Sequence, residues 1–514
     1  MATISPLNIH HKPATATDKS HHLPNNRGFV NPWPSWVKPS LAEIWSGLTW
    51  GSSSADDDTE ESSDVGEAGS SATTDFDVVE PDFGASGEKH PGRVRTWWLG
   101  HAGVLVEFPG ADGQEPLRIL FDPIFSQRCS PSQYWGPTRF YKAPCKVSDL
   151  PPIHIVLISH NHYDHLDANT ISELWKANKD HLRFVLPLGN RDWMESLLGP
   201  ECGPRMWIAD WWDEAEFWSP NGGKDNLDMA IRLGQEKKRK GELLSSSSSL
   251  TLGDHDESDD EARPRNKDYL RIVCTPAQHG SGRFAYDTGS SLWASYNVFF
   301  HPASSPENPF HLFFGGDTGY RLRPPPPALP FPPCPAFLEM HEKLGDPDLL
   351  LLPISIGSTH SYIKSWDPIG IVPKVDGGLM AQNHLDEWEA LDVARILSGQ
   401  SLGDREFKEQ YVAQQSRADH SIDRKEWALR GERKQKAAIT TKRPLAVAIH
   451  FGTFSPPAEA LGNLAALRKA CGFHSWRYAR SYDPEEGTDA QSNGTFLVLN
   501  HGGRTDVAMP TRKR

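Results

Sequence analysis

A short segment that places four potential metal ligands behind an apolar run most constrains what this chain can fold into. Residues 153–158 read Ile-His-Ile-Val-Leu-Ile, which is typical of a strand buried on both faces. His160, His162, Asp164 and His165 follow directly. Alternate positions of an extended segment point to the same side, so His160 and His162 can bind one metal ion. We expect the chain then to enter a helix, with Asp164 and His165 at its N-terminus facing a second ion.

The residue types in this segment favour a particular metal. Imidazole and carboxylate ligands without cysteine suit zinc in a catalytic site that is incompletely filled. The structural alternative is a helix N-cap flanked by solvated histidines. A helix cap uses only one such side chain, so this alternative leaves the other three residues of the segment unexplained.

Three further polar residues each follow a predicted strand. His279 comes after the strand at 271–274, Asp317 after 312–314, and His450 after 445–449. Each residue alone is weak evidence for a metal site. A single histidine after a strand is more often structural, and the sequence Gly-Gly-Asp-Thr-Gly also suits a tight turn. Their order behind the first cluster favours a shared metal site.

Composition narrows the class of protein. The formal net charge of -14 excludes nucleic-acid binding through a dominant basic face. The six cysteines contain no C-x-x-C pair, which predicts reduced thiols in a cytosolic compartment. No apolar run approaches the roughly 20 residues that span a bilayer, and the N-terminus lacks a hydrophobic signal core. We therefore expect an intracellular protein, cytoplasmic and peripheral on membranes.

Short strands alternating with helical stretches predict a layered α/β sandwich. Composition shifts divide the chain into a disordered N-terminus, a Trp-rich segment, an acidic Ser-rich linker and one large domain, at residues 1–26, 27–50, 51–92 and 93–505 respectively. The domain carries predicted insertions near 234–268, 321–335 and 403–442.

Several stretches resemble the N-acyl-phosphatidylethanolamine-hydrolysing phospholipase D family of the metallo-β-lactamase superfamily. The histidine cluster is specific only to the superfamily. Two stretches are specific to the phospholipase family, N-P-W-P-S-W at 31–36 and S-P-S-Q-Y-W-G-P at 130–137. The resemblance covers most of residues 27–50 and 93–503, apart from the insertions, and implies a four-layer αβ/βα sandwich.

The resemblance also implies a site with two zinc ions per chain. One ion would be held by His160, His162 and His279, the other by Asp164, His165 and His450, with Asp317 bridging both.

Further roles follow from the same resemblance. It implies catalytic roles for Asp164, Asp317 and His384, and substrate contacts for Tyr163, Gln278 and His384. For His384 a structural surface histidine stays an open alternative. Asp122 and Asp167 are expected to orient ligand imidazoles.

The implied reaction is cleavage of N-acyl-phosphatidylethanolamine to an N-acylethanolamine and phosphatidic acid. Another hydrolase on the same fold, such as a lactonase or a general phosphodiesterase, is the alternative. A membrane phospholipid substrate implies peripheral membrane association, and the family pattern suggests a homodimer. Trp33 and Trp36 could contact the membrane or simply pack on the domain, and both interpretations stay open.

Overall fold

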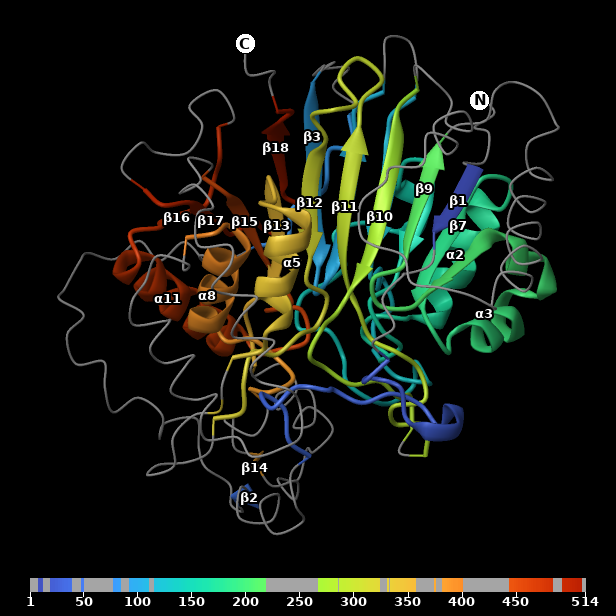
Figure 1. Ribbon diagram of the computed structural model, residues 1–514, viewed down its shortest axis with the longest axis horizontal. Helices are drawn as coiled ribbons and strands as arrows, with labels where there is room; N and C mark the ends of the chain where they lie inside the picture. The colour runs from blue at the N-terminus through green and yellow to red at the C-terminus, as the bar shows by residue number, and fades with distance from the viewer. Residues whose placement is uncertain are drawn as a thin grey trace, which may run out of the picture.

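The computed structural model describes most of the predicted domain and parts of the segments before it. The described residues are 8–12, 19–38, 48–49, 77–84, 92–110, 115–218, 267–284, 286–323, 331, 333–356, 374–375, 381–400, 443–483 and 492–510. Two mixed β-sheets stack face to face, with helices on their outer sides (Figure 1). This is the α/β sandwich of the metallo-β-lactamase fold, and it confirms the fold predicted from the sequence.

The larger sheet has nine strands. Its strands are antiparallel from β1 to β12 and parallel from β12 to β16. In spatial order they are β1 (Asn8–Lys12), β9 (Glu214–Trp218), β10 (Tyr269–Thr275), β11 (Ser295–His301), β12 (Phe310–Phe314), β13 (Leu349–Pro353), β15 (Leu445–Ile449), β17 (Thr495–Leu497) and β16 (Arg477–Ala479).

The second sheet has seven strands. It is antiparallel from β18 to β5 and parallel from β5 to β8. In spatial order they are β18 (Arg504–Ala508), β3 (Arg93–Gly100), β4 (Gly103–Phe108), β5 (Leu117–Phe121), β6 (Ile155–Leu157), β7 (Arg183–Pro187) and β8 (Met206–Ala209). A separate pair joins β2 (Leu48–Thr49) to β14 (Lys374–Val375).

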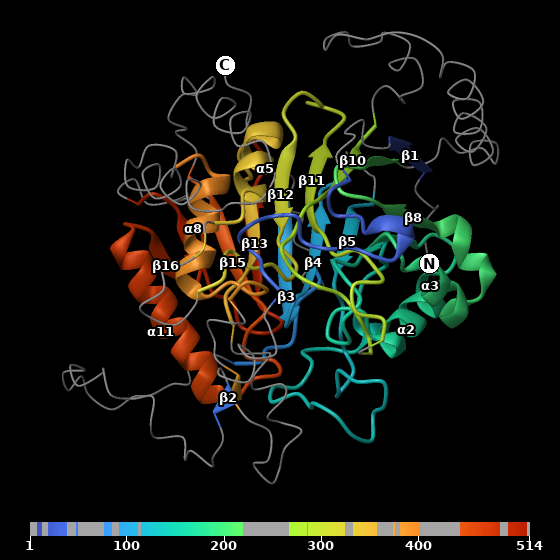
Figure 2. The same ribbon diagram turned by 60° about the horizontal axis from the view of Figure 1, so that its bottom comes forward.

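Helices cover both outer faces, which explains why β6, β13 and β15 are apolar along their whole length. The turned view separates α2 and α3 on one side from α5, α8 and α11 on the other (Figure 2). The α-helices are α2 (Ala168–Asn178), α3 (Arg191–Leu198), α5 (Ala336–Leu344), α8 (Glu387–Leu397) and α11 (Pro457–Phe473); the 3-10 helices are η1 (Pro24–Asn26), η2 (Val147–Asp149) and η3 (Pro200–Arg205). The helix predicted at 168–178 is confirmed.

The core between the sheets is built from large side chains that meet across the interface. Phe121 of β5 packs on Phe314 of β12 with ring centroids 4.7 Å apart, and Phe108 of β4 stacks on Phe300 of β11 at 5.2 Å. All four rings are fully buried. Burial of this kind is the main stabilising term of such a sandwich.

The strand directions bring four strand ends to one edge. Strands β10, β12 and β15 run parallel to one another in the larger sheet, and each is followed by a predicted ligand. In the facing sheet, β6 is followed by the histidine-rich segment. The candidate site therefore lies where the carboxyl ends of these strands meet.

The domain boundaries differ from those expected from composition. Residues 19–26, expected to be disordered, contact the domain through Lys19, His21 and His22, all of which bind the Asp210 carboxylate. The buried Asp210 carboxylate needs hydrogen-bonding partners, so this polar segment packs on the domain and is ordered. Residues 77–84 of the expected linker also pack, since Val79 N donates to His501 O at 2.8 Å.

At the other end the domain continues past residue 505, because β18 ends at Ala508. The predicted insertion at 403–442, and nearly all of that at 234–268, lie outside the described residues.

All six cysteines are free thiols. Among the described residues, no helix combines the length and the apolar character needed to cross a membrane.

Helix α8 carries a buried acid that couples stability to pH. Burial raises the pKa of Glu389 to about 8 from 4.5, so the folded protein keeps a proton that the unfolded chain releases. Its contribution to stability is complete below about pH 4.5 and is lost as the pH rises through 8. Between pH 6 and pH 9 the wild type should lose about 2–3 kcal/mol more than Glu389→Gln in urea denaturation. Parallel pH profiles for the two proteins would contradict this.

Candidate metal centre

The turn after β6 places the first group of ligands. Asp122, fully buried at the end of β5, accepts hydrogen bonds from Ser159 N at 2.7 Å and Ser159 Oγ at 2.5 Å. This fixes the chain just before His160. Residues 162–166 form turns and bends, and α2 begins only at Ala168. Asp164 and His165 therefore precede the helix, whereas the sequence placed them at its N-terminus.

Three histidines converge in a first group. His160 Nε2 lies 2.8 Å from His162 Nδ1, and His279 Nε2 lies 3.2 Å from the same His162 nitrogen. His160 and His279 are buried. These are the three histidines predicted to share one ion.

A second group lies beside the first. His165 Nε2 is 3.3 Å from His450 Nε2 and 3.7 Å from Asp164 Oδ2. His101 joins them, with its Nε2 3.0 Å from Asp164 Oδ2. Sequence reasoning assigned no role to His101. Its only signal is that it follows a strand and a glycine, as His450 and Asp317 also follow strands.

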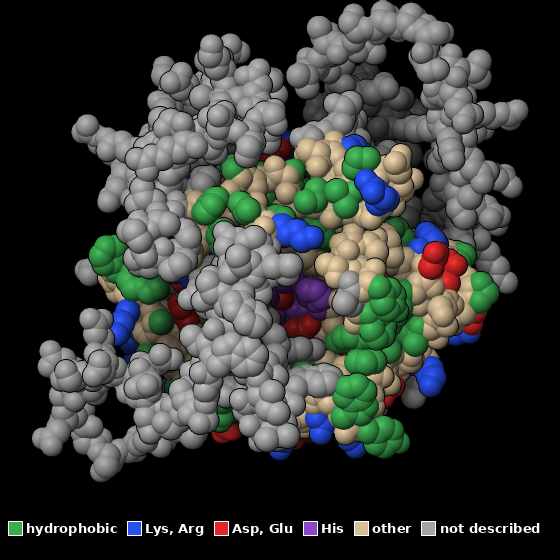
Figure 3. All heavy atoms as spheres, turned by 90° about the horizontal axis from the view of Figure 1, so that it is seen from below, with side chains coloured by type: hydrophobic (Ala, Val, Ile, Leu, Met, Phe, Trp, Pro, Cys, Tyr) green, Lys and Arg blue, Asp and Glu red, His purple; other side chains and the backbone are tan. Residues whose placement is uncertain are grey.

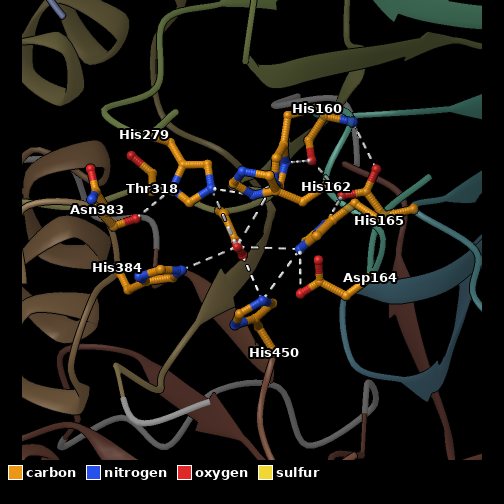
Figure 4. Close-up of polar contacts among 12 residues, drawn as sticks. His160, His162, Asp164, His165, His279, Thr318, Asn383, His384 and His450 are labelled. Carbon is orange, nitrogen blue, oxygen red and sulfur yellow. Dashed lines mark hydrogen bonds and ion pairs between the residues drawn. The ribbon is translucent and has the colours of Figure 1, made fainter. Parts of the chain in front are cut away.

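The Asp317 carboxylate lies between the two groups. The labelled histidines of both groups converge on one point (Figure 4). Asp317 Oδ1 is 2.8 Å from His450 Nε2, while its Oδ2 is 3.2 Å from His165 Nε2 and 3.7 Å from His279 Nε2. His384 Nε2 approaches the same Oδ2 at 3.4 Å. A carboxylate so placed can reach an ion on either side.

The donor set fits metal ions better than a network of hydrogen bonds. Two nitrogens bound tetrahedrally to zinc at 2.0–2.1 Å lie about 3.3–3.4 Å apart. The spacing is 3.2 Å between His279 and His162 and 3.3 Å between His165 and His450. Asp317 Oδ1 is buried and accepts no hydrogen bond, although His450 Nε2 is close to it. An orphaned carboxylate oxygen surrounded by imidazoles is the arrangement that a cation would complete.

Electrostatics keep the three histidines of the first group and the Asp317 carboxylate in the protonation states that metals require. Burial holds the pKa of His160 and His279 well below 6.5 and lowers the pKa of His162 to about 4. Burial opposes ionisation of Asp317, but His165 and His450 hold its pKa well below 3.8. The first group is therefore neutral imidazole and the bridge is a carboxylate.

Acceptors behind the rings fix which nitrogen faces inward. Asp122 Oδ2 lies 2.7 Å from His165 Nδ1, and the Asn383 carbonyl lies 2.8 Å from His279 Nδ1. Carboxylates and carbonyls only accept, so each Nδ1 carries a proton and each Nε2 faces the centre. Asp122 thus lies where an orienting role was predicted.

Asp167 does not have the predicted role. Its Oδ2 accepts from Thr170 N and from Ser126 N, both at 3.3 Å, so it caps α2 and contacts no ligand histidine. A carboxylate one residue before a helix is used by the free amides of the first turn.

The Gln278 side chain lies inside the domain. It is fully buried, its Oε1 accepts from Ser35 Oγ, and its Nε2 donates to Gln382 O at 2.8 Å. Both ends of the amide are hydrogen-bonded within the fold, and its contact with a substrate stays a prediction.

Tyr163 and His384 lie near the centre. Tyr163 is half-buried against Ile124 and Phe454, with the Arg283 guanidinium 4.0 Å above its ring. His384 is buried and close to Asp317, which excludes the open alternative of a surface histidine.

The backbone is also unusual at the centre. His101, Asp122 and His450 have φ of 50°, 35° and 61°, in the left-handed region that non-glycine residues rarely adopt. Each follows a strand end, and the sharp reversal aims the side chain into the centre.

Residues 117–253 match the family described as Beta-lactamase superfamily domain. This match, the two-sheet sandwich and the clustered ligands are those of a metallo-β-lactamase superfamily domain. The fold and the clustered ligands imply binding of divalent metal.

Three curated proteins are similar to this chain in sequence. A Mycobacterium tuberculosis protein, Rv0906, is 29% identical over 282 residues, covering 55% of this chain and 53% of that protein. N-acyl-phosphatidylethanolamine-hydrolyzing phospholipase D 1 of Caenorhabditis elegans is 25% identical over 302 residues, covering 58% and 60%. The mitochondrial N-acyl-phosphatidylethanolamine-hydrolyzing phospholipase D of Saccharomyces cerevisiae is 29% identical over 234 residues, covering 46% and 36%. The chain thus spans about half the length of the curated relatives that it matches.

Proposed function

We propose that this chain is a binuclear zinc hydrolase that cleaves N-acyl-phosphatidylethanolamine to an N-acylethanolamine and phosphatidic acid. The observation that carries the proposal is the position of Asp317 between two groups of imidazole and carboxylate ligands. Two zinc ions would supply Lewis acidity and a water of lowered pKa at neutral pH. The names of two relatives support the substrate class.

Each residue of the centre has a defined part in this proposal. His160, His162 and His279 would hold one ion, Asp164, His165 and His450 would hold the other, and Asp317 would contribute to both. His101, which contacts Asp164, fixes that carboxylate. His384, whose Nε2 lies 3.4 Å from Asp317 Oδ2, would bind a phosphate oxygen or hold a proton near the leaving group.

The surface beside the centre suits a lipid substrate. Histidine and acidic side chains lie in a hollow of the lower face, and hydrophobic side chains gather beside it (Figure 3). Four exposed aromatic residues form what we term the aromatic rim: Tyr134 and Trp135 on the loop that follows Asp122, and Phe284 and Tyr286 on the loop that follows His279. The rim joins the ligand loop, since Phe284 packs edge-on against Tyr163 at 6.2 Å. Tyrosine and tryptophan favour the membrane interface, which supports peripheral membrane contact here.

A double substitution of the rim tests this contact. We expect Tyr134→Ser with Trp135→Ser to reduce hydrolysis of vesicle-borne substrate about tenfold, because apolar area no longer enters the bilayer. Turnover of a short-chain soluble phosphodiester should stay unchanged. Phe473→Ser is the matched control, because Phe473 is 75% exposed at the end of α11. An equal loss on both substrates would contradict a membrane role.

A substrate panel separates the proposal from its alternative. The metal centre alone can attack carbonyl or phosphorus, so a lactonase or a general phosphodiesterase uses the same ligands. We expect release of N-acylethanolamine, identified by mass spectrometry, to exceed turnover of a lactone and of a soluble phosphodiester. Preferred turnover of the lactone would overturn the lipid assignment. The homodimer stays a prediction, for which light scattering is the measurement.

A further inference from the structure

The Trp-rich stretch N-P-W-P-S-W lies within a segment that crosses the edge of the sandwich beneath the metal centre. We term residues 19–38 the N-terminal strap; it is blue in the two ribbon views (Figures 1 and 2). One end is anchored at Asp210 through Lys19, His21 and His22. In the middle, Trp33 stacks on Trp211 with centroids 5.3 Å apart and an 11° interplanar angle. Trp33 is therefore used in packing.

The strap reaches the ligand His279 through one buried side chain. Asn31 Nδ2 donates to His279 O at 2.7 Å, and Asn31 Oδ1 accepts from His279 N at 3.3 Å. The same Oδ1 accepts from the Trp293 indole at 3.2 Å, which fixes the orientation of the amide. Asn31 thus binds both backbone polar groups of His279 and determines where its Cα lies.

The strap also holds the loop that orients the His279 ring. Trp36 Nε1 donates to Asn383 Oδ1 at 3.0 Å, and Val37 N donates to Gln382 Oε1 at 3.1 Å. The Asn383 carbonyl in turn accepts from His279 Nδ1. Backbone and ring of His279 are therefore both positioned by the strap, from about 250 residues away in sequence.

We infer that Asn31 is a positioning residue for the candidate ligand His279, and that Trp36 supports the same ligand through Asn383. The strap is then part of the metal centre and more than a cover for the domain. The inference rests on the metal centre of the proposed function, but on no lipid substrate. It also gives the stretch N-P-W-P-S-W a physical role that membrane contact does not require.

Zinc affinity tests the inference without any substrate. Metal-free wild type, Asn31→Ala and Trp36→Phe are titrated with zinc against a chromophoric chelator. The control is Asn178→Ala, because Asn178 is also buried, accepts from Ile153 N at 3.0 Å and donates to Leu174 O at 3.1 Å at the far end of α2. Thermal melting of the metal-free proteins reports the loss of stability alone.

We expect Asn31→Ala to weaken one of the two zinc equivalents about 10–100-fold and to leave the other near its wild-type affinity. Trp36→Phe should weaken the same equivalent by a smaller factor. Asn178→Ala should lower the melting temperature while leaving both zinc affinities unchanged.

Two outcomes overturn the inference. One is wild-type zinc affinities in Asn31→Ala, and the other is equal weakening of both equivalents, which marks general loosening. Should Asn31→Ala not fold by circular dichroism, unchanged zinc affinity in Trp36→Phe overturns it instead. Absence of zinc binding by the wild type would overturn the proposed function as well, so the two failures are distinguishable.

Discussion

Asp317→Asn is expected to reduce hydrolysis roughly a thousandfold and to lower bound zinc below two equivalents per chain. The amide has nearly the same shape, but it lacks the charge that a bridging ligand supplies, and its nitrogen cannot coordinate an ion. The carboxylate touches His450 on one oxygen and His165 on the other, so both halves of the centre depend on it. Product release and elemental analysis of the purified protein are the measurements.

The matched control is Asp348→Asn. Asp348 Oδ2 accepts from His311 N at 2.8 Å, at the start of β13 and away from the ligands. It should keep activity and zinc content. Asp317→Asn with two zinc equivalents and wild-type turnover would sink the binuclear assignment.

Asp122→Ala is expected to destabilise the fold by about 3–5 kcal/mol and to weaken zinc binding. Three buried donors, Ser159 N, Ser159 Oγ and His165 Nδ1, would lose their acceptor at once. Leaving buried donors unpaired costs far more than the net value of the bonds. Urea denaturation of the metal-free protein measures the first effect and chelator competition the second.

Asp122→Asn keeps the shape of the side chain and removes its negative charge, so it shows how much of the stability depends on the charge. It keeps one carbonyl acceptor, so its loss of stability should be intermediate between wild type and alanine. A free energy of unfolding for Asp122→Ala within 1 kcal/mol of wild type would show that the acceptor has no structural role.

The sequence predicted the parts of the site that are coded locally. His160, His162, Asp164 and His165 follow one strand within six residues, so their convergence needs no knowledge of distant packing. His279, Asp317 and His450 could be placed by a topological rule, because parallel strands end at one edge of a sheet. His101 escaped notice because a single histidine after a glycine carries no spacing signal.

The direction in which a side chain points could not be predicted from the sequence. Gln278 and Asp167 are adjacent to ligands or near them, yet Gln278 joins Ser35 to Gln382 and Asp167 caps a helix. The polar composition of the segment that begins at Lys19 predicts a disordered tail, because the partner of this segment, Asp210, lies about 190 residues away. Contacts of such sequence separation depend on the folded arrangement of both sheets.

The left-handed backbone at His101, Asp122 and His450 has a consequence for how the protein acquires its ions. Such conformations cost about 1–3 kcal/mol each and persist only where the surrounding fold imposes them. The energy that shapes the pocket is therefore supplied by the sandwich during folding and need not be drawn from metal binding. We therefore expect metal ions to bind at a preformed site. Exchange of one ion for another should leave the backbone in place.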